Sequence, residues 1–137
     1  MSVLNRLDLR TILTLDAIAS GAMGLLLLLG ATFLDGLFDL PVNFLRVTGA
    51  ILLPWAGALI IAASRQPVSR AAVRAIAAVN LAWVAGSLVL LASGWVDPST
   101  LGIAFVIVQA IAVAGFAAIQ IARITGTESI ASGAYPA

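Results

Sequence analysis

A few polar side chains interrupt long apolar stretches of this chain, and they are the residues best placed for chemistry. Four of them fall near the centres of those stretches: Trp55, Asn80, Trp83 and Gln109. Amide and indole groups in apolar surroundings are costly unless they form hydrogen bonds, so such residues either join neighbouring helices or recognise a ligand. We expect a hydrogen bond between Asn80 and Gln109. It would act as an adhesive between helices or as the polar floor of a pocket for a lipid-soluble ligand.

A second candidate site is a cluster of charged and amide groups nearer one end of the stretches: Asp16, Gln120, Arg74 and Arg123. Ser20 follows Asp16 by one helical turn, so the two share a face. A carboxylate in apolar surroundings must be neutralised or paired. The structural interpretation is a carboxylate held by Arg or Gln, and the functional one is a proton or cation site. A proton pathway would need a second carboxylate deeper in the chain's apolar stretches, and the sequence has none there.

Two further groups of charges lie outside the apolar centres. Arg46 and Asp97 are predicted to form an ion pair that locks one end of the fold, with a lipid phosphate as the alternative partner of Arg46. At the other end, Arg65, Arg70 and Arg74 form a basic segment. These arginines determine topology or attract anionic lipid.

The composition removes most familiar chemistry. The chain has no Cys and no His, so it lacks thiols, the commonest transition-metal ligands and the usual axial ligands of haem. No phosphate-binding, dinucleotide-binding, zinc-protease or serine-hydrolase motif is present. A net charge of +1 gives no reason to expect a nucleic-acid partner. We therefore expect no enzyme activity, no cofactor and no metal site.

The elements that must position these residues are four continuous apolar stretches, residues 11–34, 44–64, 71–93 and 100–122. A hydrocarbon core of about 30 Å needs about 20 helical residues, and each stretch has that length. The lack of alternation excludes a barrel. We predict an all-α integral membrane protein, an up-down four-helix bundle. Close packing of the first two helices is favoured by their glycines, Gly21, Gly24, Gly30, Gly49 and Gly57. Residues 1–10 form an N-terminal segment, and 124–137 are expected to be a disordered tail.

Arginines are distributed unevenly among the segments that connect the stretches. One side of the predicted bundle carries Arg6, Arg10, Arg65, Arg70, Arg74 and Arg123, and the other carries only Arg46 with three aspartates. Positively charged short loops stay in the cytoplasm, which predicts that both termini are cytoplasmic.

Three short segments resemble a known kind of protein. They are LRVTGA at 45–50, LLP at 52–54 and NLAWV at 80–84. They resemble uncharacterised small four-helix membrane proteins of bacteria, of the DoxX-like and SPW-type groups. The resemblance implies a four-helix bundle in the bacterial inner membrane. It transfers no activity and no site residues.

Two functions from different classes remain. The first is a non-catalytic accessory or assembly subunit of a larger membrane complex, or a self-associating bundle. Its partners would be membrane lipid and other membrane protein subunits, or a second copy of the chain. The alternative is a binder or transporter of a small lipid-soluble ligand, which predicts a cavity at the level of Asp16, Asn80, Trp83 and Gln109.

Overall fold

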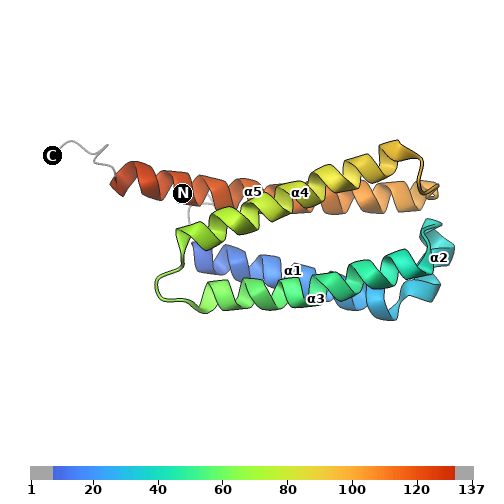
Figure 1. Cartoon of the computed structure of the whole chain (residues 1–137), viewed down its shortest axis with the longest axis horizontal. Helices are drawn as coiled ribbons and strands as arrows, with labels where there is room; N and C mark the ends of the chain where they lie inside the picture. The colour runs from blue at the N-terminus through green and yellow to red at the C-terminus, as the bar shows by residue number, and fades with distance from the viewer. Residues whose placement is uncertain (1–7, 132–137) are drawn as a thin grey trace.

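The computed structural model describes the backbone of residues 8–131 and the side chains of residues 8–125. The described chain forms five helices: α1 (Leu9–Leu29), α2 (Ala31–Phe38), α3 (Val42–Ser64), α4 (Arg70–Ser93) and α5 (Thr100–Ala131) (Figure 1). Four of them, α1, α3, α4 and α5, are long and apolar enough to cross a membrane. The all-helical class and the four apolar helices are as predicted, and they describe a multi-pass membrane protein.

Two helix boundaries differ from the prediction. The first apolar stretch does not form one helix over 11–34, because it breaks at Gly30 and continues as the separate short helix α2. The Gly30 N–H still bonds to the Leu26 carbonyl at 2.8 Å, and a Cβ at Gly30 would lie 2.7 Å from that same oxygen. At the other end of the chain α5 continues to Ala131, so residues 124–131 of the expected disordered tail are helical. Residues 1–7 and 132–137 lie outside the described part.

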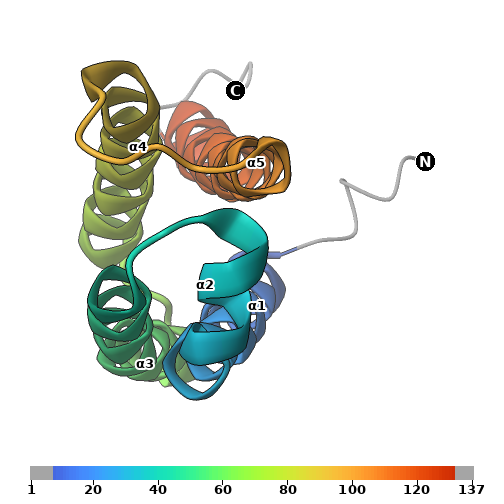
Figure 2. The ribbon, with the colours of Figure 1, turned by 90° about the vertical axis from the view of Figure 1, so that its right-hand side faces the viewer.

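The long helices associate as two pairs, α1 with α3 and α4 with α5, as the view along the bundle shows (Figure 2). Glycines bring α1 and α3 into backbone contact. A Cβ on Gly49 would lie 2.6 Å from the Gly24 carbonyl oxygen and 2.7 Å from the Leu28 nitrogen. Small residues allow this approach in a membrane, where apolar burial alone gives helices little reason to associate. Close packing of this pair is confirmed at Gly24 and Gly49, whereas a Cβ at Gly57 would meet no atom within 4 Å and one at Gly30 would meet only Leu26.

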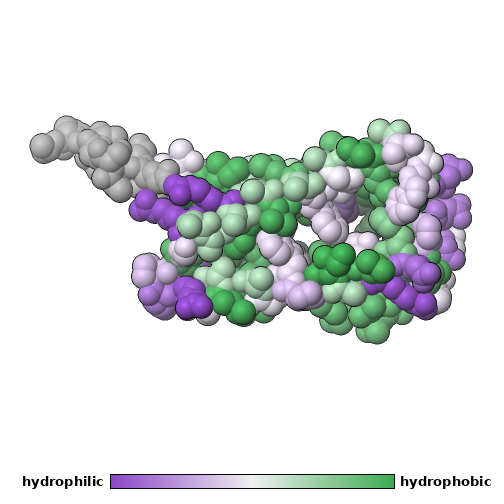
Figure 3. Space-filling view, viewed as in Figure 1, coloured by the Kyte–Doolittle hydropathy of each residue, from purple (hydrophilic) through white to green (hydrophobic). Residues whose placement is uncertain are grey.

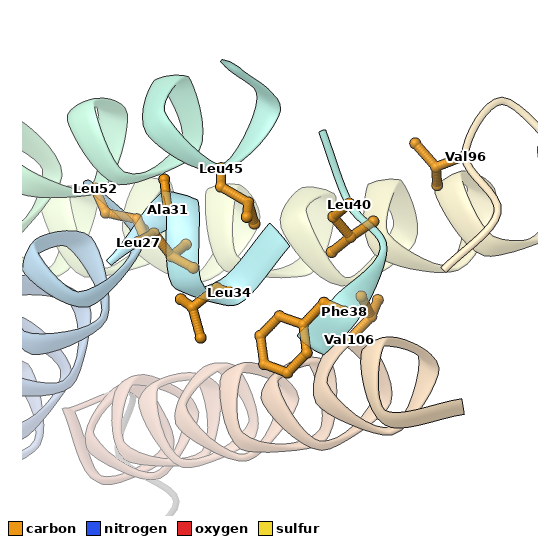
Figure 4. Close-up of a cluster of buried hydrophobic side chains, with 9 residues drawn as sticks. All are labelled: Leu27, Ala31, Leu34, Phe38, Leu40, Leu45, Leu52, Val96 and Val106. Atoms are coloured by element: carbon orange, nitrogen blue, oxygen red, sulfur yellow. The ribbon is translucent and has the colours of Figure 1, made fainter. Parts of the chain in front are cut away.

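The short helix α2 closes one end of the bundle by contacting the start of α5. The Ser99 N–H donates to the Phe38 carbonyl at 2.9 Å, and the Ser99 hydroxyl donates to the Leu37 carbonyl at 2.7 Å. Gly102 leaves no room for a Cβ beside the Phe38 carbonyl. An apolar cluster forms around this end (Figure 4), consisting of Leu27, Ala31, Leu34, Phe38, Leu40, Leu45, Leu52, Val96 and Val106.

The opposite end is held by local caps and by Arg10. The Asp8 carboxylate accepts the Thr11 N–H at 2.8 Å as the N-cap of α1, and that hydrogen bond lowers the pKa of Asp8 below its usual value. Ser69 caps α4 in the same way. The Arg10 guanidinium donates to the carbonyls of Ala63 and Arg65 at 2.9 and 3.3 Å, which satisfies groups that the end of α3 leaves free.

Hydrophilic side chains gather at the two ends of the molecule, and the surface between them is largely apolar (Figure 3). Many of the large apolar side chains on that surface are exposed, including Ile18, Leu29 and Val89. An apolar belt between two polar ends is the surface that a lipid bilayer covers.

Candidate functional site

Three buried polar side chains from three different helices meet inside the bundle. Asp16 on α1 is 3% exposed, Asn80 on α4 is 4% exposed and Gln120 on α5 is fully buried. The Asn80 amide nitrogen donates to the Asp16 Oδ2 at 3.0 Å and to the Gln120 Oε1 at 3.1 Å. The Gln120 amide nitrogen donates to the same Oδ2 at 2.8 Å. We call these three residues the polar triad.

The polar triad connects the two helix pairs, because Asp16 belongs to one pair and Asn80 and Gln120 belong to the other. Ser20, one turn after Asp16, donates its hydroxyl to the Asp16 Oδ1 at 3.3 Å. The carboxylate therefore accepts three hydrogen bonds, all from neutral donors. Hydrogen bonds between membrane helices contribute about 0.6–2 kcal/mol each, so the polar triad can hold the pairs together.

A second polar cluster joins α4 to α5. The Trp83 indole N–H donates to the Gln109 Oε1 at 2.9 Å. The Gln109 amide nitrogen donates to the Ser87 hydroxyl oxygen at 3.0 Å and to the Val106 carbonyl at 2.8 Å. The Ser87 hydroxyl in turn donates to the Trp83 carbonyl at 2.8 Å. Trp83, Ser87 and Gln109 are half-buried, and we call them the tryptophan cluster.

The expected Asn80–Gln109 hydrogen bond is wrong. Asn80 bonds to Asp16 and Gln120, whereas Gln109 bonds to Trp83 and Ser87. The depths estimated along each helix put the two amides at one level, but α4 packs against α5 with Gln109 level with Trp83 and Ser87, and with Asn80 level with Gln120, about three helical turns further along α5. Trp55, the fourth residue of the predicted layer, belongs to neither polar cluster and packs instead against apolar side chains. These are the cluster near α2 and a second cluster toward the other end of the bundle, which consists of Leu13, Ala17, Leu59, Ala63, Val73, Ile76 and Ile124.

The predicted charge cluster is recovered in part. Gln120 contacts Asp16 as expected, and the hydrogen bonds that Asp16 accepts come from Ser20, Asn80 and Gln120 rather than from an arginine. Arg74 is exposed and Arg123 half-buried on their helices. The amide of Asn80 takes the place that the prediction gave to an arginine, since an amide at this depth satisfies the carboxylate without bringing a second charge into the interior.

The predicted lock between Arg46 and Asp97 is not formed among the described residues. Both side chains are exposed, and that end of the bundle is joined instead by the hydrogen bonds of Ser99 to α2. Exposed ion pairs contribute little, whereas backbone carbonyls at a helix end need donors. In the basic segment, Arg65 is exposed, Arg70 is half-buried, and the Arg65 carbonyl accepts from Arg10.

A cavity of about 560 Å³ lies between the two helix pairs, and Figure 3 shows the surface hollowed there. Its lining is mostly apolar, and five aromatic side chains contribute to it. Six residues bring polar groups to it: Asp16, Ser20, Thr48, Trp83, Ser87 and Gln109. Asn80 and Gln120 are not part of the lining. Along α1 the lining extends from Asp16 to Leu27, about 16 Å at the helical rise.

Polar groups occur along the length of the cavity. Asp16 and Ser20 lie toward one end of the lining, and α2 closes the other end, where the rings of Phe38 and Phe105 stack with their centroids 4.6 Å apart and Gln109 follows Phe105 by one helical turn. A volume in this range, apolar walls and a few polar groups are the features of small-molecule sites. Within the described residues no group of three His, Cys, Asp or Glu side chains could hold a metal ion.

The sequence-based prediction did not include Ser87, Thr48 or the aromatic residues near α2 among the site residues. Ser87 was visible only as a residue on the face of Asn80 and Trp83, and its hydrogen bond to Gln109 depends on the packing of α4 on α5. Thr48 and the aromatic residues near α2 gave no signal, because they lie within apolar stretches where most residues face lipid. The cavity itself depends on how far apart the two pairs stand, which hydropathy does not encode.

The chain is thus an all-helical, multi-pass membrane protein with a cavity whose lining includes a buried carboxylate. It matches no family model, and comparisons with curated proteins and with solved structures find no match. The resemblance to DoxX-like and SPW-type proteins rests on the three short segments alone.

Proposed function

We propose that this protein binds a small lipid-soluble ligand within the membrane, in the cavity between its two helix pairs. The single observation that carries the proposal is the cavity of about 560 Å³, whose walls are mostly apolar and carry a few polar groups. Sites for small molecules have volumes of about 300–1,000 Å³ and use a few polar groups to orient the ligand. An adhesive role alone needs the polar residues but gives no reason for a cavity beside them.

The route into this cavity runs from the lipid. Several of its lining residues on α1 and α5 are small or exposed, among them Ala19, Ala104, Val108 and Ala112. Since the outer surface at this level is the apolar belt, a ligand that enters between α1 and α5 comes from the hydrocarbon phase rather than from water. This favours a ligand with a long apolar body.

The proposal is tested by photo-crosslinking with a fatty alcohol that carries a diazirine in its chain, using protein reconstituted in phosphatidylcholine nanodiscs. We expect cross-links to concentrate on peptides that line the cavity and to be suppressed by excess untagged alcohol. Met23→Trp should reduce them severalfold, because Met23 lines the cavity. Leu25→Trp on the same helix is the matched control, since Leu25 is 50% exposed and points away.

Two outcomes would contradict the proposal. Cross-links spread evenly over lipid-facing residues such as Leu29 and Val89 would mean that the probe only samples the bilayer. Equal cross-linking in Met23→Trp and Leu25→Trp would mean that the cavity does not hold the ligand.

We also propose the location and orientation that the charges favour: the bacterial inner membrane, with the arginine-bearing end of the bundle and both termini in the cytoplasm. Arg10, Arg65 and Arg70 lie at the end of the molecule where α1 begins and α3 ends. Anionic lipid headgroups are the natural partners of that basic end.

A second candidate function is that of an accessory subunit or a self-associating bundle. One observation favours it: the exposed face of α4 carries Ala78, Ala82 and Gly86 at intervals of four, and nothing lies within 4 Å of a Cβ built on Gly86. Such a face allows another helix to approach closely. Gly86→Leu should abolish cross-linking to a second copy or subunit, and Gly57→Leu is the control. A monomer with no co-purifying protein in mild detergent would count against this candidate.

A further inference from the structure

The polar groups that line the cavity have already used their hydrogen-bond donors within the protein. The Trp83 indole donates to Gln109, and both amide hydrogens of Gln109 go to Ser87 and Val106. The hydroxyl groups of the lining are committed in the same way. Ser20 donates to Asp16, Ser87 to the Trp83 carbonyl and Thr48 to the Phe44 carbonyl.

What the lining can still offer a ligand is therefore a set of acceptors. Hydroxyl oxygens and amide oxygens have two lone pairs, and a carboxylate has about four acceptor positions. Ser87, Thr48 and Gln109 thus retain acceptor capacity. A ligand whose polar head only accepts hydrogen bonds, such as a ketone or an ester, would find no donor among these groups.

The strongest remaining acceptor is the Oδ1 of Asp16. Its partner oxygen Oδ2 accepts from the amides of Asn80 and Gln120 at 3.0 and 2.8 Å, whereas Oδ1 accepts only from Ser20, at the longer distance of 3.3 Å. Asp16 and Ser20 line the cavity, and Asn80 and Gln120 do not. The less satisfied oxygen is therefore on the cavity side of the carboxylate.

Two aromatic residues of the lining lie one helical turn from the amides that donate to this carboxylate. Trp83 lies one turn after Asn80 on α4, Phe116 lies one turn before Gln120 on α5, and both line the cavity. Aromatic rings stabilise cations in sites from which water is excluded. A buried carboxylate with neutral partners likewise favours a cationic group beside it.

From these contacts we infer that the ligand is a lipophilic amine, whose protonated head donates to Asp16 Oδ1 while its apolar chain extends along α1 toward α2. This inference rests on the proposed function and specifies its ligand class. Because the lining offers only hydrogen-bond acceptors, it favours ligands whose polar head group donates hydrogen bonds. The Asp16 carboxylate favours a positively charged head group over a neutral hydroxyl. A fatty acid is disfavoured because its own carboxylate would face Asp16.

The experiment compares three diazirine probes with the same twelve-carbon chain and an amine, alcohol or carboxylate head, in phosphatidylcholine nanodiscs. Hydrogen bonds to charged groups are stronger than those between neutral groups, so we expect the amine probe to label the cavity at about tenfold lower concentration than the alcohol probe. The carboxylate probe should label least. Asp16→Asn should remove the preference for the amine over the alcohol. Asp97→Asn, an exposed site with the same change of charge, should keep the preference.

Ser20→Ala keeps the inference testable if Asp16→Asn does not fold. This variant leaves the carboxylate in place and removes its competing donor, so the amine preference should be retained or increased. Equal labelling of the cavity by amine and alcohol, or an unchanged amine preference in Asp16→Asn, would overturn the ligand class and leave the cavity function standing. Failure of all three probes to label the cavity would instead contradict the proposed function.

Discussion

At the scale of single residues, the interior is organised by amides rather than by charges. Asn80 divides its two amide hydrogens between a carboxylate on α1 and an amide on α5, so one residue contacts both partners of the polar triad. No water competes for these groups in the hydrocarbon region, and a partner that is lost leaves a buried polar atom unsatisfied. Each member of the polar triad thus bonds to both others, and two of the three members are uncharged amides.

Asn80→Leu should lower the stability of the protein by about 1–3 kcal/mol, because it leaves the Gln120 Oε1 without its donor and removes one donor from Asp16. Thermal unfolding in a fixed detergent measures the effect. Asn43→Leu is the matched control, since Asn43 is exposed at the start of α3. If the two variants unfold at the same temperature, the polar triad does not stabilise the bundle.

At the scale of helices, two kinds of contact define the α1–α3 pair. Glycine backbones touch near the middle, and Arg10 on α1 supplies donors to the last carbonyls of α3. The glycine contact forms because these residues have no side chain, whereas the Arg10 contact requires a long side chain. Both specify that the start of α1 lies beside the end of α3.

Gly49→Ala should destabilise the protein by about 1–3 kcal/mol, because its Cβ would collide with the Gly24 carbonyl oxygen and the Leu28 nitrogen. Gly57→Ala, in the same helix, is the control. No atom lies within 4 Å of a Cβ at that position, so it should be neutral or slightly stabilising through helix propensity. Equal unfolding temperatures for the two variants would show that moving α1 away from α3 at this contact does not lower the stability of the protein.

The N-cap of α1 predicts an acid-dependent loss of stability. The Thr11 N–H lowers the pKa of Asp8 in the folded protein, so the cap contributes fully above the unfolded pKa of about 3.9 and is lost as the pH falls through the lower folded value. Asp8→Asn keeps a neutral cap and should lose less stability than the original chain when the pH is lowered from 5 to 3. Unfolding curves over that range compare the two, and identical acid slopes would contradict the cap's contribution.

At the scale of the whole molecule, the polar ends and the apolar belt set its position in a bilayer, and the two helix pairs create the space between them. The α3–α4 turn lies at the arginine-bearing end, and α2 lies at the other. The cavity therefore has its carboxylate nearer the arginine-bearing end. In the proposed orientation that is the cytoplasmic side of the membrane.

Orientation can be read by labelling single cysteines, since the chain has none of its own. Gly36→Cys on α2 and Gln66→Cys in the α3–α4 turn both place a thiol at an exposed position. With a membrane-impermeant maleimide, intact cells should label Gly36→Cys, and Gln66→Cys should react only after permeabilisation. The reverse pattern would overturn the proposed orientation.

Hydropathy was sufficient to predict the helical class and the four spanning helices, because a bilayer demands apolar segments of a set length. The end of α1 at Gly30 and the continuation of α5 to Ala131 were not predicted, because neither a break in the backbone nor a longer helix changes the hydropathy of the sequence. In the site, Asp16 and Gln120 were paired correctly since they share a depth. Asn80 and Gln109 were wrongly paired with each other because counting residues along each helix does not give the axial register of α4 against α5.

The pairing of α1 with α3 and of α4 with α5 has a consequence for the covalent continuity of the chain. Each pair has its own interface. The two pairs are joined covalently by one short turn, and otherwise by noncovalent contacts: those of α1 and α2 with α5, the polar triad and the apolar clusters. The peptide link at residues 65–69 is thus dispensable in principle. Two co-expressed polypeptides, divided within that turn, should find each other in the bilayer and rebuild the intact fold by complementation, and Asn80→Leu should weaken their reassembly.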